Sequence, residues 1–170
     1  MAQRPQFQDL YVARRGAVRA TAYLLCGDWH LAEDLAQAAF VRLYQRWGRL
    51  QHRDGLEAYL HRTVVRLWID ETRRRRHRDT LVAEPPDTQE HAGPALPDPG
   101  LLRVLRRLPP RQRACVVLRY FNDLSVAQTA ELLGCTTGTV KSQTSRALDA
   151  LRANLGAVVV DAAETKEKSE

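Results

Sequence analysis

The chain has 170 residues, of which 44% are hydrophobic and 27% are charged. This apolar content is enough for a packed core and argues against a wholly disordered chain, whereas no apolar stretch reaches the roughly 20 residues that cross a bilayer. The N-terminus also lacks the apolar run of a secretion signal. We therefore expect a folded protein of one or two domains, cytoplasmic in localisation and without membrane insertion.

Charge is distributed unevenly along the sequence. Lys and Arg outnumber Asp and Glu by 26 to 20. Residues 1–78 contain 15 basic and 8 acidic side chains, and residues 101–155 contain 9 and 3. Residues 79–100 contain 5 acidic side chains and no Lys or Arg. Two basic blocks on either side of an acidic strip are typical of a protein with two separate polyanion-binding surfaces.

The first basic block, residues 1–78, contains three stretches in which apolar side chains recur at helical spacing. They cover the ranges 7–25, 31–47 and 56–68. Asp28 is the expected N-cap of the second stretch, and Asp54 with Glu57 has the spacing of a capping box for the third. Because no stretch alternates with period two, this domain is predicted to be all helix.

The acidic strip, residues 79–100, has the composition of a flexible linker. Five of the eight prolines lie between Pro85 and Pro99, and the segment has no hydrophobic periodicity. Fully extended at about 3.3 Å per residue, it spans on the order of 70 Å. The sequence thus predicts an all-α protein with two small helical domains, 1–78 and 101–155, that are joined by this linker.

The second domain contains four predicted helices. Asp98 and Pro99 have the pattern of a helix start, and the segment LPPRQRACVVLRYF begins another helix behind its own prolines. The last two helices meet at a glycine and have helix-turn-helix spacing. Residues 156–170 are polar, and we expect them to form a disordered tail.

Local signals define the ends of the helix-turn-helix. Ser125 and Gln128 have capping-box spacing at the start of its first helix. Gly134 has the position of the left-handed residue that ends that helix, and Thr136 is the expected cap of the next one. The second helix is therefore predicted to run from Thr137 to about Leu155.

One face of this last helix is apolar and the opposite face is polar and basic. The spacing directs inward the side chains of Val140, Thr144, Ala147, Leu148 and Leu151. Outward or lateral in the first two turns are then Lys141, Ser142, Gln143, Ser145 and Arg146. The first turns of a recognition helix enter the DNA major groove, although a solvated surface has the same pattern. The arginine-rich segment 101–120, which has no acidic residue, favours DNA contact.

Enzymatic and metal-binding motifs are not found in the sequence. The five histidines have no HExxH spacing, and no GxSxG, Walker or Rossmann glycine pattern occurs. Cys26, Cys115 and Cys135 are far apart and form no CxxC pair, which favours reduced thiols over a disulfide framework or zinc site, with a redox sensor as the alternative. We expect a protein that is not an enzyme and needs no cofactor or metal.

The motifs together resemble the extracytoplasmic-function (ECF) sigma factors of bacterial RNA polymerase. The segment LPPRQRACVVLRYFNDLSVAQTAELLGCTTGTVKSQTSRALDALR resembles their region 4 domain, which reads the minus-thirty-five promoter element. The segments DWHLAEDLAQAAFVRLYQRW and YLHRTVVRLWIDETRRRRHR resemble their region 2 domain, which binds polymerase and opens the minus-ten element. Within the family, the chain is most similar to a small actinobacterial SigE-like subgroup.

The resemblance implies specific contacts with the minus-thirty-five element and with polymerase. Implied contacts with the minus-thirty-five element are made by Arg119, Thr137, Lys141, Ser142, Gln143, Ser145 and Arg146. Implied contacts with the polymerase clamp helices are made by Asp34, Gln37, Phe40, Arg42 and Leu43. Gln143 replaces a residue that is basic in many relatives, and Ala38 replaces a common acidic residue, so promoter preference and core binding are expected to differ in detail.

For the minus-ten element, the resemblance implies that the loop from Gly48 to Gly55 captures a flipped base. The residues implied are His52, Arg53, Asp54, Arg62, Arg66, Arg73 and Arg74. Extruding a base requires a few kcal/mol, which stacking and phosphate contacts offset. Trp47, Tyr59 and Trp68 are the available aromatics, although their helical spacing favours a place in the core.

The implied partners are core RNA polymerase, through its clamp helices and flap, promoter DNA, and an anti-sigma protein. Two other hypotheses remain open from the sequence. A stand-alone helix-turn-helix regulator would bind operator DNA as a dimer without polymerase. A sigma-like protein that only sequesters polymerase or an inhibitor would form the complex and start no transcripts.

Overall fold

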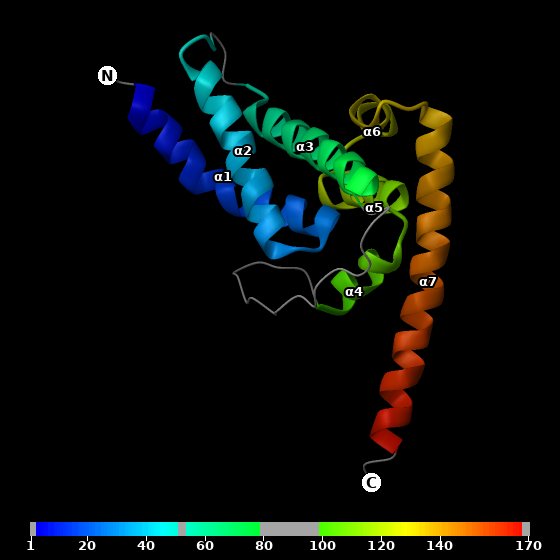
Figure 1. Ribbon diagram of the computed structural model, residues 1–170. Coiled ribbons are helices and arrows are strands. Elements are labelled where there is room, and N and C mark those ends of the chain that lie inside the picture. The colour runs from blue at the N-terminus through cyan, green and yellow to red at the C-terminus, as the bar shows by residue number, and fades with distance from the viewer. Residues whose placement is uncertain (1–2, 51–53, 79–98, 168–170) are drawn as a thin grey trace. The chain divides into compact units, whose positions relative to one another are not determined.

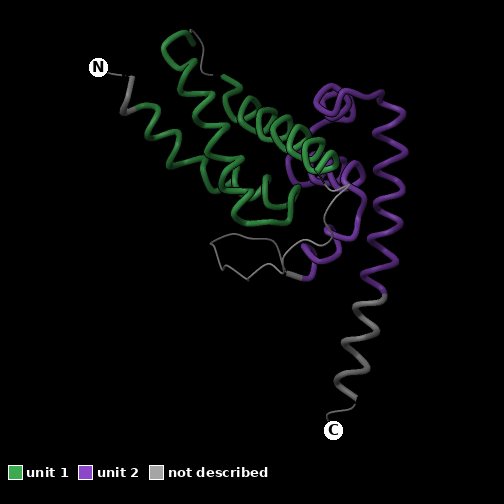
Figure 2. The backbone as a smooth tube through the Cα atoms, viewed as in Figure 1, with its two compact units in different colours: residues 1–96 green, residues 97–170 purple. Residues whose placement is uncertain are grey.

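The computed structural model describes residues 3–50, 54–78 and 99–167, and the secondary structure of these ranges consists of helices joined by short turns. The chain divides into two compact units, residues 1–96 and 97–170 (Figure 2). The all-α prediction with two domains is therefore confirmed, whereas the predicted linker lies almost entirely outside the described residues. In the described ranges, no helix is long and apolar enough to span a membrane.

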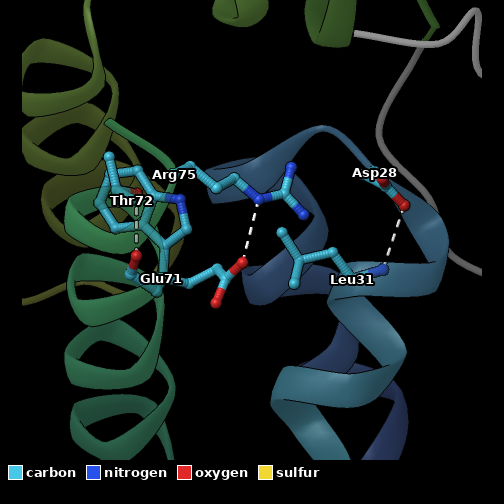
Figure 3. A network of polar contacts seen from close by, with 6 residues as sticks. Asp28, Leu31, Glu71, Thr72 and Arg75 are labelled. Atoms are coloured by element: carbon cyan, nitrogen blue, oxygen red, sulfur yellow. Dashed lines mark hydrogen bonds and ion pairs between the residues drawn. The ribbon is translucent and has the colours of Figure 1, made fainter. Parts of the chain in front are cut away.

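The first unit consists of three helices that pack against one another (Figure 1). They are α1 (Gln3–Cys26), α2 (Trp29–Trp47) and α3 (Leu56–Arg78). Asp28 is the N-cap of α2, as predicted, because its Oδ1 accepts the Leu31 N–H at 3.1 Å (Figure 3). Apolar side chains at helical spacing from all three helices form a single core.

Aromatic side chains close one end of this core. The Phe7 ring of α1 packs edge-on against the rings of Phe40, Tyr44 and Trp47 of α2, with centroids 4.9–6.5 Å apart. Trp47 and Trp68 are 4% and 6% exposed. Both tryptophans are thus core residues, and neither presents a free face on which a DNA base could stack.

The start of α3 differs from the prediction by one residue. Gly55, not Asp54, is at the cap position, because its carbonyl accepts the Tyr59 N–H at 2.9 Å. Gly55 has φ of 78°, a conformation that is strained for a residue with a Cβ. The predicted capping box is therefore wrong, and Glu57 instead pairs with Arg14 of α1 at 3.1 Å.

A buried histidine makes the first unit sensitive to pH. His61 of α3 is 8% exposed, and its Nε2 lies 3.8 Å from the Glu57 carboxylate. Burial lowers the pKa of His61 below its ordinary value of 6.5, with Arg14 acting in the same direction and Glu57 opposing it. The unfolded chain therefore binds this proton at a higher pH than the folded chain does.

We expect the free energy of unfolding of the first unit to fall as the pH decreases through about 6.5. All three tryptophans lie in this unit, so urea unfolding followed by tryptophan fluorescence between pH 5 and 7.5 measures it separately. His61→Gln is expected to flatten this pH dependence. Equal slopes for the wild type and His61→Gln contradict the assignment.

The second unit contains the predicted helix-turn-helix. Its elements are α4 (Pro99–Arg107), α5 (Pro110–Val116), a π-helix, η1 (Val117–Phe121), α6 (Val126–Leu133) and α7 (Thr137–Glu167). The helix α7 packs against α4, α5 and α6. It continues beyond the boundary predicted at residue 155, because the sequence after Gly156 is rich in alanine and contains no proline.

The π-helix was not predicted from the sequence. The segment LPPRQRACVVLRYF was expected to form one regular helix, but its last turn widens over Val117–Phe121 and ends where the Asn122 N–H bonds the Val117 carbonyl. Asp123 follows with φ of 52°, in the left-handed region. Single π-turns of this kind are frequent at functional sites.

The predicted caps of the helix-turn-helix are confirmed. Ser125 and Gln128 form a reciprocal capping box, with bonds of 3.1 and 2.8 Å. Gly134 ends α6 with φ of 62°. Thr136 accepts the Thr139 N–H at 3.1 Å and so caps α7. These local contacts define where α6 begins and ends and where α7 begins.

Gly134→Ala is expected to destabilise the second unit by about 1 kcal/mol, because a Cβ is unfavourable at this positive φ. The matched control is Gly138→Ala in the first turn of α7, where a Cβ meets only the Thr136 Oγ1 at an ordinary 3.8 Å. Thermal unfolding followed by circular dichroism compares the two variants. Equal stability of both variants contradicts this account of the turn.

Candidate nucleic-acid interface

The first half of α7 has the two faces that the sequence predicted. Val140 and Ala147 are fully buried, Thr144 and Leu151 are each 8% exposed, and Leu148 is half-buried. The opposite surface is formed by the exposed residues Thr137, Lys141, Ser142, Ser145 and Arg146, with Gln143 half-buried. The Ser142 hydroxyl donates to the Thr139 carbonyl at 3.0 Å. This surface presents cationic and hydroxyl groups on the N-terminal turns of α7. These are the turns of a recognition helix that enter the DNA major groove.

A groove of about 290 Å³ lies along one flank of this surface. Its cationic side chains are Arg119 of η1 and Lys141 and Arg152 of α7. Its remaining lining consists of Val126, Thr144, Ser145 and Leu148. The groove thus combines three positive charges with the apolar side chains of Val126 and Leu148, and its lining contains no acidic residue.

Arg119 is held in place by the turn that follows the π-helix. Its Nη1 donates to the Leu124 carbonyl at 2.6 Å, and its guanidinium lies 6.0 Å from the centre of the Tyr120 ring. The side chain is half-buried. An arginine fixed in this way loses little conformational freedom when it binds an anion.

Other arginines of the second unit have structural contacts that the sequence did not reveal. Arg113 is half-buried, and its Nη2 donates to the carbonyls of Arg106 and Leu108 at 3.1 and 3.2 Å, at the end of α4. Arg107 donates to the Asn154 side chain at 3.3 Å. The sequence suggested that all the arginines between 101 and 120 are available for phosphate contact. The structure shows that Arg107 and Arg113 already have contacts within the protein.

The three cysteines are free thiols. Cys115 is 1% exposed in the core cluster that it forms with Ala130 and Val140, and Cys135 packs against this cluster. Burial, with a smaller effect of Cys135, raises the pKa of the Cys115 thiol to about 11. Within the residues that the structure describes, no group of His, Cys, Asp or Glu could hold a metal ion.

A second basic surface lies on α3. Arg62, Arg66 and Arg73 are exposed and recur at i, i+4 and i+11, so they follow one face of the helix over about 16 Å. Arg74 is exposed beside them. Arg75 pairs with Glu71 at 3.0 Å (Figure 3), whereas Arg62, Arg66, Arg73 and Arg74 have no ion pair in the described ranges.

The loop predicted to capture a minus-ten base is described only in part. Asp54 is exposed next to Gly55. His52 and Arg53 lie outside the described residues, so their predicted role is untested. The described basic surface of this unit consists of the α3 arginines.

The predicted polymerase contacts on α2 separate into an exposed and a buried group. Asp34, Gln37 and Arg42 are exposed. Phe40 and Leu43 are 4% and 1% exposed in the core against α1 and α3, and their predicted contact with polymerase stays a prediction.

The sequence reasoning missed two exposed apolar residues on α2. Val41 is 55% and Tyr44 46% exposed. They lie seven and ten residues after Asp34, on the same face of the helix. Val41 follows the core residue Phe40 by one position, and Tyr44 follows the core residue Leu43 in the same way. An apolar residue directly after a core position faces away from the core, and this pattern could have identified both.

Comparison with known proteins agrees with both units. Residues 10–78 match the family Sigma-70 region 2, and residues 100–151 match Sigma-70 region 4. The chain is 35% identical over 163 residues to the RNA polymerase sigma-E factor of Streptomyces avermitilis, which covers 92% of this chain and 89% of that protein. It is 28% identical to the ECF RNA polymerase sigma factor SigW of Bacillus subtilis, with 88% of each chain covered.

Solved structures share the fold. The sigma factor RpoE of Bartonella quintana, solved in complex with the anti-sigma factor NepR, superposes with a TM-score of 0.72 at 24% identity, covering 89% of this chain and 97% of that chain. CnrH, in complex with the cytosolic domain of CnrY, superposes with a TM-score of 0.60 at 21% identity, covering 91% and 90%. The two matched regions and the 35% identity to a sigma-E factor establish that the chain belongs to the ECF family of sigma factors, which direct transcription initiation by RNA polymerase.

Proposed function

We propose that the second unit reads the minus-thirty-five promoter element through α7. Lys141, Ser142, Ser145 and Arg146 contact bases and adjacent phosphates, and Thr137 and Gln143 lie at the edges of this surface. The observation that carries the proposal is the two-faced α7, because its apolar face is buried and its cationic first turns are exposed. Arg146 is the strongest candidate for a bidentate contact with guanine.

The first unit supplies the minus-ten contacts in this proposal. The exposed arginines of α3 follow the DNA backbone, and the loop from Gly48 to Gly55 holds the extruded base. Because Trp47 and Trp68 are buried, stacking of the base on either of these two rings is not part of the mechanism. Asp54 is exposed at the described edge of this loop.

Core polymerase binds the exposed face of α2 in this proposal. Asp34 and Gln37 supply polar contacts and Val41 and Tyr44 supply apolar area, with Arg42 at the margin. Phe40 and Leu43 hold this face in position from the core. The family also implies contact of the second unit with the polymerase flap.

The chain has no catalytic role of its own in this proposal, acts in the cytoplasm and requires no cofactor. Of the two similar structures, the sigma factor RpoE was solved in complex with the anti-sigma factor NepR, and CnrH was solved in complex with the cytosolic domain of CnrY. By analogy, an anti-sigma protein is the expected inhibitor of this chain.

The proposal is tested by measuring promoter-DNA binding of the full chain with and without core polymerase. A sigma factor is expected to bind a selected promoter duplex tightly only in the presence of the core enzyme. Tight specific binding by the chain alone, as a dimer, would instead indicate a stand-alone regulator.

A further inference from the structure

Two cysteines of the second unit lie together in the core of the helix-turn-helix. Cys115 of α5 is 1% exposed and forms a buried cluster with Ala130 of α6 and Val140 of α7. Cys135, in the turn between α6 and α7, is half-buried and packs against this cluster. Both thiols are free. The fold therefore brings two distant cysteines of the sequence together at the turn of the helix-turn-helix.

The two thiols differ in their access to solvent and in their readiness to lose a proton. Burial, with a smaller effect of Cys135, raises the pKa of Cys115 to about 11, so this thiol is protonated at neutral pH and is a poor target for oxidation. Cys135 is partly exposed, so a small oxidant meets its thiol first. The effect of Cys135 on the Cys115 pKa also requires the two sulfur atoms to be near each other. An accessible thiol beside a second thiol is the arrangement of a redox-sensitive pair.

We propose that Cys135 is a site of reversible oxidation and that Cys115 converts its oxidised form into a disulfide. The inference rests on the proposed function, because its consequence is a loss of promoter binding. A peroxide is the oxidant. Its O–O bond breaks as the Cys135 sulfur takes one oxygen and becomes a sulfenic acid, and the other oxygen leaves as water with the thiol proton. The Cys115 sulfur then displaces the hydroxyl group, so that the S–S bond forms, the S–O bond breaks, and the Cys115 proton leaves with the hydroxyl as a second water.

Proximity compensates for the low acidity of Cys115. Only a small fraction of this thiol is ionised at neutral pH, but the sulfenic acid on Cys135 lies against the same cluster, and reacting groups held in contact have a high effective concentration. Cys26 differs in both respects. It is the one cysteine of the first unit, and its thiol donates to the Asp28 carbonyl at 3.1 Å. Cys26 therefore serves as the matched control.

The disulfide alters the start of the recognition helix. A disulfide holds its two sulfur atoms at about 2.05 Å, well inside the contact distance of two free thiols. The turn has little freedom to absorb this approach, because Gly134 ends α6 at a left-handed φ of 62° and Thr136 caps α7 through the Thr139 N–H. Oxidation therefore draws the turn toward α5 and displaces the first turns of α7, which carry the proposed base contacts.

The experiment treats the full chain alone with a small molar excess of hydrogen peroxide. The peroxide is removed before core polymerase is added, so the thiols of the core enzyme never meet the oxidant. Peptide mapping by mass spectrometry under non-reducing conditions identifies the cross-link, and the intact chain loses about 2 Da when two thiols become one disulfide. Binding of the assembled holoenzyme to a promoter duplex is then measured before and after dithiothreitol. The duplex is one that the reduced holoenzyme selects from a randomised library.

The oxidised wild type is expected to contain the Cys115–Cys135 disulfide and to bind the promoter about fivefold more weakly or worse, which corresponds to at least one lost base contact. Recovery of core polymerase is unchanged, and dithiothreitol restores promoter binding. Cys135→Ala, a change at a half-buried turn position, is expected to bind the promoter normally and to keep this binding after peroxide. Cys115→Ala is protected in the same way, whereas Cys26→Ala responds as the wild type does.

Three results would overturn the proposal. Peroxide treatment that yields no Cys115–Cys135 disulfide would show that the pair is structural only. A disulfide that forms but leaves promoter binding unchanged would remove the switch. Equal loss of binding by oxidised wild type and peroxide-treated Cys135→Ala would assign the effect to another group. If the reduced wild-type holoenzyme binds no promoter duplex, the proposed function itself fails, and the peptide map still decides whether the disulfide forms.

Discussion

Arg146→Ala is expected to lower promoter binding and initiation by about fivefold to 150-fold while core polymerase is recovered normally. Arg146 is exposed on the polar and basic surface of α7, opposite its buried apolar face. Loss of one bidentate contact with a base removes about 1–3 kcal/mol of discrimination between the preferred base and the others. Binding is weakened most for promoters that have the preferred base at the contacted position. The variant should therefore distinguish less between the bases at that position than the wild type does. Run-off transcription on paired promoter variants measures both effects.

The control for Arg146→Ala is Arg15→Ala, an exposed arginine of α1 that belongs to neither basic surface. It is expected to leave initiation unchanged. Because Arg146 makes no hydrogen bond or ion pair within the described residues, its removal should not alter the circular dichroism melting curve. Parallel loss of DNA binding and polymerase binding would indicate damaged folding and would contradict the assignment.

Asp34→Arg is expected to abolish co-purification with core polymerase. Asp34 is exposed on the same face of α2 as Val41 and Tyr44, and a reversed charge at the edge of an apolar contact is repelled and must be desolvated. Such a change costs several kcal/mol when the partner charge is cationic. Affinity capture of core polymerase by the tagged chain measures it.

Asp9→Arg is the matched charge reversal, at an exposed position of α1. It is expected to capture core polymerase as the wild type does. Val41→Ser tests the apolar part of the same face and should weaken capture without affecting the stability of the unit, because Val41 is 55% exposed. Normal capture by Asp34→Arg would remove α2 from the polymerase interface.

The helix ends were predictable because capping is local. Asp28, Ser125 with Gln128, and Gly134 each act on backbone groups within one helical turn, so the sequence alone carries the information. At α3 the same reasoning failed, because Asp54 and Gly55 are both acceptable caps and only the folded backbone decides between them. The inward face of α7 was predictable because its apolar residues recur at helical spacing.

The candidate site was less predictable where tertiary contacts decide. Phe40, Leu43 and Trp47 recur at the spacing of a helix face that packs into a core, and all three are buried. The family resemblance, in contrast, placed Phe40 and Leu43 on a contact surface. The π-turn has no sequence signature, and it determines where Arg119 lies. Arg113 differs from neighbouring arginines only by its contacts with the carbonyls of Arg106 and Leu108.

As a sigma factor, the chain directs polymerase to start transcription at promoters. The most direct measurement is run-off transcription by purified core polymerase on library-selected promoter DNA, with and without the full chain. The account predicts a transcript of defined start only when the chain is present, and its reduction by Arg146→Ala. A chain that binds core polymerase but yields no transcript, or that binds the promoter duplex tightly without polymerase, would contradict it.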